Sequence, residues 1–181
     1  MRFNPLESAQ INSLREEIPE LEVHFDNHTR VEYGHDYTED FSFPPDVVAK
    51  PRSKEEISKL LKWCNKNRIP ITPRGAGTGL SGAALAVEKG VCLSMEYFNK
   101  IIEIDKANLQ ATVEPGVINQ VFHDACKAEG LFYPPDPSSW GSSFLGGNLA
   151  LNAGGPKAVK YGVTNAYVLN LEVVLPNGEI I

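Results

Sequence analysis

Four glycines lie within the eight residues from Gly75 to Gly82, and this run constrains the fold more than any other feature of the sequence. Glycine loses backbone entropy on folding and buries no side chain, so a folded domain needs a compensating reason for such a run. One reason is close approach, because backbone N–H groups without Cβ atoms nearby can converge on an anion, usually a phosphate. Arg74 adds a permanent positive charge, and Thr78 and Ser81 add hydroxyl donors. A tight surface turn, the alternative, accounts for one or two glycines but poorly for four.

The residue order in this loop separates it from two common phosphate-binding motifs. It lacks the Gly-Lys-Ser/Thr ending of a P-loop, which excludes a nucleotidase of that type. The stretch from Gly77 to Gly82 has the spacing G-x-G-x-x-G, but the dinucleotide fingerprint requires a crossover helix directly after it. Residues 83–89 are too few for that helix, which argues against a nicotinamide-type Rossmann site.

The residues around this loop predict a βαβ unit. Residues 46–50 are a Val-rich run ended by a proline, and residues 69–72 are a second short strand whose prolines confine it to a sheet edge or a strand end. Between them, residues 53–56 form a capping box, and apolar side chains at helical spacing continue to about Asn67. Two strands joined in this way run parallel, and residues 91–94 can add a third.

The first 45 residues are acidic, with ten acids and three bases, whereas the rest of the chain is almost neutral. Asn4 as N-cap and Pro5 at the first helical position predict a helix start, and residues 20–45 are expected to wrap the surface without regular structure. The acidic segment is most simply a solvated face, with an acidic docking surface as the alternative. The net charge of −6 argues against a nucleic-acid partner.

The pattern becomes antiparallel in the second half of the chain. Residues 101–105 and 110–114 alternate apolar and polar positions around a short turn, which predicts a hairpin. A helical stripe from Ile118 ends before Gly130, and residues 168–175 predict a strand that leads into an Asn-Gly turn. Only two residues of the returning strand follow, which would leave an unpaired edge, so we expect this chain to be the front part of a longer protein.

A second group of small residues lies far downstream of the first loop. Residues 134–139 form a rigid, hydroxyl-rich segment, and the glycine-rich run 146–155 and residues 161–163 follow it. Two separated loops of this kind indicate an elongated ligand held along its length. Asn148 and Asn152 lie four residues apart and would share one side of a helical turn. Taken alone, this run has a tightly packed helix contact as its alternative interpretation.

Composition limits the setting in which this chain works. With 42% hydrophobic and 22% charged residues, the sequence lacks the signature of disorder. No stretch approaches the ~20 apolar residues of a membrane span, and the first residues lack the apolar segment of a signal peptide. Three scattered cysteines predict neither a disulfide framework nor a zinc site, so a reducing cytoplasm is expected and no metal. His123 and Cys126, within the predicted helix, are interpreted as structural.

Four runs carry a family resemblance, and they occur in the order PRGAGTGLSGAA (73–84), PPDPSS (134–139), GGNLALNAGGPKAVKYGVT (146–164) and YVLNLEVVLPNGEII (167–181). Together they resemble the flavin-binding domain of the FAD-linked oxidases related to vanillyl-alcohol oxidase and p-cresol methylhydroxylase. Within that group the sequence is most similar to the glycolate oxidase FAD subunit and to the D-lactate and D-2-hydroxyglutarate dehydrogenases. The resemblance runs from about Asp36 to the last residue.

This resemblance implies an α+β fold, a two-lobed FAD-binding domain of the p-cresol methylhydroxylase type with FAD between its lobes. Residues 1–35 carry little of the resemblance, and their own sequence predicts an N-terminal helix and an acidic arm. Residues 36–97 would form a small βαβ lobe. Residues 98–181 would form a mainly antiparallel lobe with helices, truncated at its C-terminal end.

The resemblance also assigns residues to the cofactor. The backbone of the first loop would hold the pyrophosphate, through Arg74, Gly75, Ala76, Gly77, Thr78, Gly79, Leu80 and Ser81. The flavin ring or the ribityl chain would be contacted by Pro135, Asp136, Ser138 and Ser139. The middle of the cofactor would be lined by Gly146, Gly147, Asn148, Asn152, Ala153, Gly154 and Gly155. The cleft would be closed by Tyr161, Gly162 and Val163. Some relatives attach FAD through a histidine near the position of Thr78. No histidine occurs in this loop, so FAD would be bound non-covalently.

For the whole protein, the resemblance implies oxidation of a small 2-hydroxy acid of the glycolate or D-lactate type, with hydride passing to flavin N5 while a base takes the hydroxyl proton. No catalytic residue is assigned, because the family's substrate-orienting residues would lie beyond Ile181 and His24, His28 and His35 are expected to be solvent-exposed. The implied partners are an unidentified electron acceptor and other oxidase subunits, in the cytoplasm or at a membrane through those subunits. The alternatives are an FAD-binding module without turnover of its own, and a flavin reductase of the UDP-N-acetylmuramate reductase type.

Overall fold

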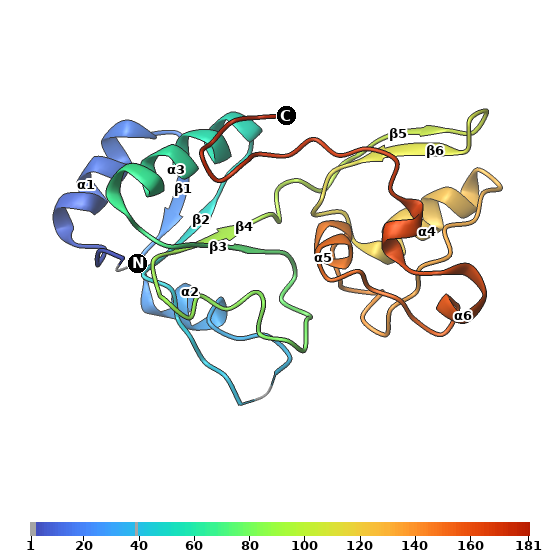
Figure 1. Cartoon of the computed structure of the whole chain (residues 1–181), viewed down its shortest axis with the longest axis horizontal. Helices are drawn as coiled ribbons and strands as arrows, with labels where there is room; N and C mark the ends of the chain where they lie inside the picture. The colour runs from blue at the N-terminus through green and yellow to red at the C-terminus, as the bar shows by residue number, and fades with distance from the viewer. Residues whose placement is uncertain (1–2, 39) are drawn as a thin grey trace. The chain divides into compact units, whose positions relative to one another are not determined.

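The computed structural model describes residues 3–38 and 40–181, which divide into two compact units (Figure 1). Unit 1 contains the chain up to Tyr97 together with Glu172–Ile181, and unit 2 contains Phe98–Leu171. By packing, residues 172–181 therefore belong with the first unit, although the sequence analysis placed them in the second lobe. The predicted boundaries at residues 35 and 97, between an arm and two lobes, are not tested by this division and stay a prediction. No helix among the described residues is long and apolar enough to cross a bilayer.

Unit 1 is built on a four-stranded sheet with the order β1-β2-β4-β3. Its strands are β1 (Glu22–His24), β2 (Val47–Lys50), β3 (Ile71–Arg74) and β4 (Val91–Ser94). β2 and β3 both run parallel to β4, which lies between them, and β1 is antiparallel to β2. The three strands of the predicted βαβ region are thus confirmed, with β3 at the edge that its proline requires. β3 begins two residues later than the sequence pattern suggested.

The helix between the first two parallel strands is α3 (Lys54–Asn67), and the residues that predicted its start form its cap. Ser53 Oγ accepts the Glu56 N–H at 3.2 Å, whereas the Glu56 carboxylate reaches the Arg52 N–H at 3.1 Å. The helix buries Leu60 and Trp63 in the core of unit 1, and the central strands β2 and β4 are almost wholly buried as well. Burial of β2 and β4 matches their continuous apolar sequences.

Two expectations for the N-terminal region are wrong. Helix α1 (Ser8–Glu17) begins after Glu7 rather than Asn4, and Glu7 forms a capping box with Gln10. The side chain of Asn4 instead donates to the Asn67 carbonyl oxygen at 2.8 Å, at the end of α3. The segment expected to lack regular structure contains β1 and a short helix, α2 (Asn27–Glu32), whose N-cap Asp26 accepts the Thr29 N–H. β1 is three residues long, too short for its alternation to be visible in sequence.

Glu22 fixes β1 through a cluster of hydrogen bonds within unit 1. Its carboxylate bonds with His24 Nε2 and the Tyr97 hydroxyl, both at 2.9 Å, and with Arg52 Nη2 at 2.8 Å. The bond with His24, followed by those from Arg52 and Tyr97, lowers the pKa of Glu22 to about 2, although desolvation opposes this. A lowered pKa in the folded state stabilises the fold above the ordinary glutamate pKa, and that stability is lost as the pH falls toward the folded-state pKa.

We therefore expect the Glu22→Gln variant to lose less stability than the wild type between about pH 5 and about pH 2, because the charge whose protonation weakens the wild type is absent. Urea unfolding midpoints at both pH values measure the difference. Glu16→Gln, an exposed acid of α1, is the control and should follow the wild type. Equal acid dependence in all three proteins would contradict the role given to Glu22.

Unit 2 contains an antiparallel hairpin and four short helical segments. The hairpin strands are β5 (Ile101–Asp105) and β6 (Gln110–Val113), and the helical segments are α4 (Asn119–Ala128), α5 (Leu145–Ala150), α6 (Ala158–Tyr161) and the 3-10 helix η1 (Thr164–Tyr167). A small core of Val117, Phe122, Cys126 and Leu145 lies between α4 and α5. The predicted hairpin and the helix ending before Gly130 are both confirmed.

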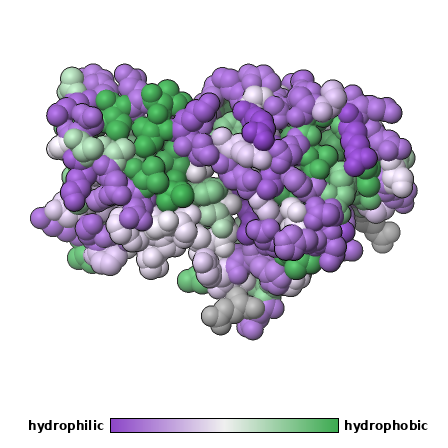
Figure 2. Space-filling view, turned by 180° about the vertical axis from the view of Figure 1, so that it is seen from behind, coloured by the Kyte–Doolittle hydropathy of each residue, from purple (hydrophilic) through white to green (hydrophobic). Residues whose placement is uncertain are grey.

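The strand expected over residues 168–175 is wrong for most of its length. Among the described residues it forms only the bridge between Val174 and Ile180, with the turn through Gly178 that the Asn-Gly pair predicted. A strand needs a hydrogen-bonded neighbour, and residues 168–172 have none among the described residues. Leu169 and Leu171 are consequently exposed. Figure 2, which views the molecule from behind, shows that hydrophobic side chains gather in patches among hydrophilic ones on the face it presents.

Candidate functional site

The first glycine loop begins where β3 ends at Arg74, and it presents a row of unused donors. None of the eight backbone N–H groups from Gly75 to Gly82 donates a hydrogen bond to a described residue. The loop does accept a hydrogen bond from another part of unit 1, because the Gly79 carbonyl oxygen accepts the Tyr37 N–H at 3.1 Å. Backbone N–H groups that lack protein partners and follow one another in a loop can converge on an anion, so this row of donors suits an anionic ligand.

Gly77 lets the Arg74 guanidinium lie directly against this loop. Its φ is +70°, in the left-handed region that favours glycine. A Cβ built at this position would lie 2.1 Å from Arg74 Nη2 and 2.5 Å from Arg74 Cζ. Any side chain at residue 77 would therefore displace the guanidinium.

Arg74 is a buried cation without a counter-charge. The residue is 9% exposed, and its guanidinium forms no hydrogen bond or ion pair with any described residue, with Nη1 fully buried. The guanidinium makes a cation–π contact with the face of the Tyr33 ring, 5.3 Å from Cζ to the ring centroid. Buried charges are normally paired, so this site fits a ligand that brings its own negative charge.

The other loop residues predicted to contact the cofactor differ in exposure. Ala76 and Thr78 are half-buried, Leu80 is 78% exposed and Ser81 is exposed. The hydroxyls of Thr78 and Ser81 form no hydrogen bond within the described part of the chain. Their contact with a cofactor stays a prediction.

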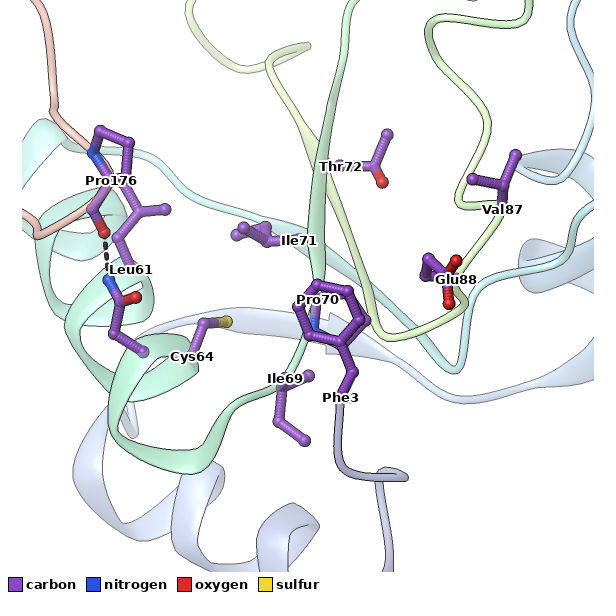
Figure 3. A pocket seen from close by; sticks show the side chains of 11 residues that line it. Phe3, Leu61, Cys64, Ile69, Pro70, Ile71, Thr72, Val87, Glu88 and Pro176 are labelled. Carbon is purple, nitrogen blue, oxygen red and sulfur yellow. Dashed lines mark hydrogen bonds between the residues drawn. The ribbon is translucent and has the colours of Figure 1, made fainter. Parts of the chain in front are cut away.

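A hollow of about 340 Å³ elsewhere in unit 1 does not resemble a diphosphate site (Figure 3). Its lining is mainly apolar, with Leu61, Ile69 and Ile71 among the side chains, and Glu88 as its charged group. The Asn65 amide closes one side by donating to the Pro176 carbonyl oxygen. An anion would meet no cation there.

In unit 2, Asn119 joins two of the segments predicted to hold the cofactor. Its side chain is completely buried at the start of α4. Asn119 Nδ2 donates to the Pro135 carbonyl oxygen at 3.1 Å, and Asn119 Oδ1 accepts Asn148 Nδ2 at 3.0 Å. The Pro-rich segment is thereby held to α5. Asn119 is not predictable from the sequence as a site residue, because one asparagine beside an amphipathic stripe carries no local signal.

Asp136 joins the Pro-rich segment to a third predicted stretch. Its carboxylate accepts the Lys157 N–H at 3.3 Å and pairs with Lys157 Nζ at 3.1 Å. Gly155 has a φ of +134°, and a Cβ there would lie 2.2 Å from the Asp136 carbonyl oxygen. Only glycine permits this approach, so Asp136 and Gly155 belong to one local structure.

Ser138 and Ser139 lead from the Pro-rich segment toward α5. Ser138 is exposed, and the Ser139 carbonyl oxygen accepts the N–H groups of Ser142 at 2.9 Å and Ser143 at 2.8 Å. Ser143 Oγ is buried without a partner among the described residues. Ser143 is not among the predicted residues, because only the fold buries its hydroxyl.

The adjacent glycines of α5 have different surroundings. A Cβ on Gly146 would lie 2.6 Å from the Pro115 Cβ, and the Gly146 N–H donates to the Pro115 carbonyl oxygen at 2.8 Å. A Cβ on Gly147 would meet no atom within 4 Å. Gly146 is therefore explained by packing, whereas Gly147 faces open space that a ligand could enter.

Asn148 and Asn152 do not share one side of a helical turn, contrary to the expectation. Asn148 is buried within α5, whereas Asn152 follows the helix with a φ of +51°. Asn152 Oδ1 accepts the Asn165 N–H at 3.0 Å. Left-handed asparagine commonly ends a helix, which accounts for Asn152 without a ligand.

The last predicted residues come together after α5. The Ala153 carbonyl oxygen accepts both the N–H and the hydroxyl of Thr164, at 3.0 and 2.7 Å. A Cβ on Gly154 would lie 3.2 Å from Val163 Cγ1. Ala153 and Gly154 thus lie beside Thr164 and Val163.

The cysteines offer no reactive thiolate. Burial raises the pKa of Cys64 and of Cys92 to about 12, and it also raises the pKa of Cys126. All three are protonated at neutral pH, as expected of buried structural cysteines. The described residues also contain no group of three His, Cys, Asp or Glu side chains placed to hold a metal ion.

Comparison with known sequences assigns this fold and loop to a family. The chain matches the family described as "FAD binding domain" over residues 45–181, and it belongs to that family, whose cofactor is FAD. It is 49% identical over 155 residues to glycolate oxidase subunit GlcD of Bacillus subtilis, covering 86% of this chain and 33% of that protein. It is 40% identical to D-lactate dehydrogenase of Anaerostipes hadrus, covering 99% of this chain and 38% of that protein. The chain thus spans about a third of the length of these relatives.

Solved structures share the fold at low sequence identity. An alkyldihydroxyacetonephosphate synthase matches with a TM-score of 0.84 at 24% identity, over 98% of this chain and 38% of that one. Physcomitrella patens BBE-like 1 matches with a TM-score of 0.80 at 19% identity, over 95% of this chain and 37% of that one. The predicted fold class, an α+β FAD-binding domain of the p-cresol methylhydroxylase type, is confirmed.

Proposed function

We propose that Arg74 and the N–H groups of residues 75–81 bind the diphosphate of FAD, and that the cofactor is held non-covalently. The observation that carries this proposal is the buried Arg74 guanidinium, which has no counter-charge among the described residues and lies against unused amide donors. A diphosphate supplies the missing negative charge and accepts those hydrogen bonds. No histidine is present in the loop to attach the flavin.

The predicted residues of unit 2 are proposed to bind the remainder of the cofactor. These are Pro135, Asp136, Ser138, Ser139, Gly146, Gly147, Asn148, Asn152, Ala153, Gly154, Gly155, Tyr161, Gly162 and Val163. The bonds of Asn119 and Asp136 support the assignment, because they hold three of these stretches in one arrangement. Within the set, Gly147 is best placed for contact, and Gly146 and Asn152 act in support of the backbone.

For the whole protein we propose oxidation of a small 2-hydroxy acid, of the glycolate or D-lactate type. When bound, FAD supplies a hydride acceptor at flavin N5. The chain's own residues bind and orient the cofactor, and no general base is assigned to them. Two curated relatives bear the names glycolate oxidase subunit and D-lactate dehydrogenase, which supports this substrate class. Other oxidase subunits and an electron acceptor are proposed partners, in the cytoplasm or at a membrane through those subunits.

A second candidate is an FAD-binding module that has no turnover by itself. It is favoured for this chain alone, because the chain spans about a third of its relatives' length. The two candidates share the cofactor and differ in whether the bound flavin can be reduced by a substrate.

The test begins with FAD binding. The purified chain, mixed with FAD and dialysed, should keep a visible flavin absorption spectrum, and acid precipitation should release the flavin into the supernatant. Loss of all flavin on dialysis, or flavin remaining with the acid precipitate, would count against the proposal. Bleaching of the flavin by glycolate or D-lactate in the full-length protein, but not in this chain, would support both the enzyme and the module assignments.

A further inference from the structure

Three residues at the carboxyl ends of adjacent parallel strands place their side chains together in unit 1. Lys50 ends β2, Ser94 ends β4 and Arg74 ends β3. Arg74 and Ser94 are register partners, so their side chains lie on one face of the sheet. Glu96 follows two residues after Ser94. Lys50 and Arg74, the two cations at this edge, both lie against the Tyr33 ring.

The Glu96 carboxylate is fully engaged by groups other than Arg74. Lys50 Nζ lies 2.8 Å from Glu96 Oε1, the Tyr33 hydroxyl donates to Glu96 Oε2, and Ser94 Oγ donates to the same oxygen at 3.2 Å. Desolvation alone would raise the pKa of Glu96, but the hydrogen bonds from Lys50 and Tyr33 outweigh it and lower that pKa. The carboxylate is charged, and its charge is balanced by Lys50.

Arg74 lies close to the same cluster but outside its hydrogen bonds. The Tyr33 ring contacts Arg74 with one face at 5.3 Å and lies 4.9 Å from Lys50 Nζ, while its hydroxyl holds Glu96. Burial is the main cause of the raised pKa of Cys92. That thiol also feels the charges of Arg74, Glu96 and Lys50. Without Lys50, the neighbouring carboxylate would be the natural partner of the unpaired guanidinium.

We propose that Lys50 is a positioning residue for cofactor binding: by pairing with Glu96, it keeps that carboxylate away from Arg74 and leaves the guanidinium available for the diphosphate. This inference rests on the proposed function of the Arg74 loop. It assigns to Lys50 and Glu96 an effect on affinity without direct contact with the cofactor.

The test is the FAD dissociation constant of isosteric variants, measured by flavin fluorescence quenching on folded protein. Lys50→Met should raise the constant about ten- to hundredfold, because Glu96 then captures Arg74 and the diphosphate loses a charge-assisted hydrogen-bond donor. Lys50→Arg, which preserves the pair, should bind like the wild type. The double variant with Glu96→Gln should recover most of the lost affinity, because no carboxylate remains to compete. Inorganic pyrophosphate, as a competing ligand, should follow the same order.

The Arg74→Met background distinguishes an effect of Lys50 through Arg74 from a purely structural role of Lys50. If Lys50 acts through Arg74, adding Lys50→Met to Arg74→Met should leave the dissociation constant unchanged, although both lower the unfolding temperature. The inference would be overturned if the two substitutions lowered the FAD affinity additively, or if Lys50→Met bound FAD like the wild type. As long as the wild-type protein binds FAD, neither result affects the proposed function. Failure of the wild type to bind FAD would overturn the proposed function itself.

Discussion

Replacing Gly77 with alanine should raise the dissociation constant for FAD by about ten- to hundredfold, and Gly77→Asp should abolish retention of the cofactor. The alanine Cβ would lie 2.1 Å from Arg74 Nη2, so the guanidinium must leave the loop. An aspartate adds a carboxylate that pairs with Arg74 and repels the diphosphate. Titration of FAD into the purified variants, followed by flavin fluorescence, measures both effects.

Gly82→Ala is the matched control for this prediction. Gly82 has the same φ of +70°, but a Cβ there would meet only Leu85 Cδ1, at 3.7 Å. Both alanine variants carry the left-handed backbone cost of about 1–2 kcal/mol, so thermal unfolding should change to a similar degree. Only the Gly77 variant should lose FAD affinity. Equal affinities in the two variants would refute the assignment of the diphosphate to Arg74 and its loop.

Replacing Asn119 with leucine should lower the free energy of unfolding of unit 2 by about 2–6 kcal/mol, since two buried groups lose their partners at about 1–3 kcal/mol each. Those groups are the Pro135 carbonyl oxygen and Asn148 Nδ2. Trp140 is a reporter within unit 2, and Trp63 reports on unit 1. Urea unfolding followed by fluorescence in a Trp63→Phe background therefore measures unit 2.

Asn170→Leu provides the comparison for this substitution. Asn170 is exposed and forms one local hydrogen bond, with the Leu171 N–H, so its replacement should change stability by less than about 0.5 kcal/mol. The Asn119 variant should also lose FAD affinity, because the segments it joins would separate. A variant at Asn119 as stable as the one at Asn170 would show that this asparagine does not join them.

The elements predicted correctly from sequence are those whose signals are local. Ser53 caps α3 in the structure as its spacing from Glu56 indicated, and β5 and β6 form the predicted antiparallel pair, with a register shift between Ile101 and Glu103. Caps and alternation depend on residues within one turn or one strand, so a sequence contains them in full. The loop after Arg74 was identified for a similar reason, because its glycines express a local backbone requirement.

The misplaced elements are those that a distant partner decides. Asn4 had the residue type of an N-cap, but the carbonyl group of Asn67 at the end of α3 takes its side chain. Residues 168–172 have the composition of a strand, yet a strand exists only where a neighbour supplies hydrogen bonds. Asn119 and Lys50 were missed for the same reason. The role of each depends on groups brought together by the fold.

The return of residues 172–181 to unit 1 makes unit 2 an insertion within a discontinuous domain. Ser58 Oγ donates to the Gly178 carbonyl oxygen, and a Cβ on Gly178 would lie 2.6 Å from Lys62 Cγ, so these last residues are seated closely on α3. During synthesis on the ribosome, the first unit cannot complete its packing until every residue of the second has been translated. The chain passes between the units twice, after Tyr97 and after Leu171. Proteolytic cleavage at either connection alone would leave the two fragments associated through this contact, so both connections must be cut to release unit 2.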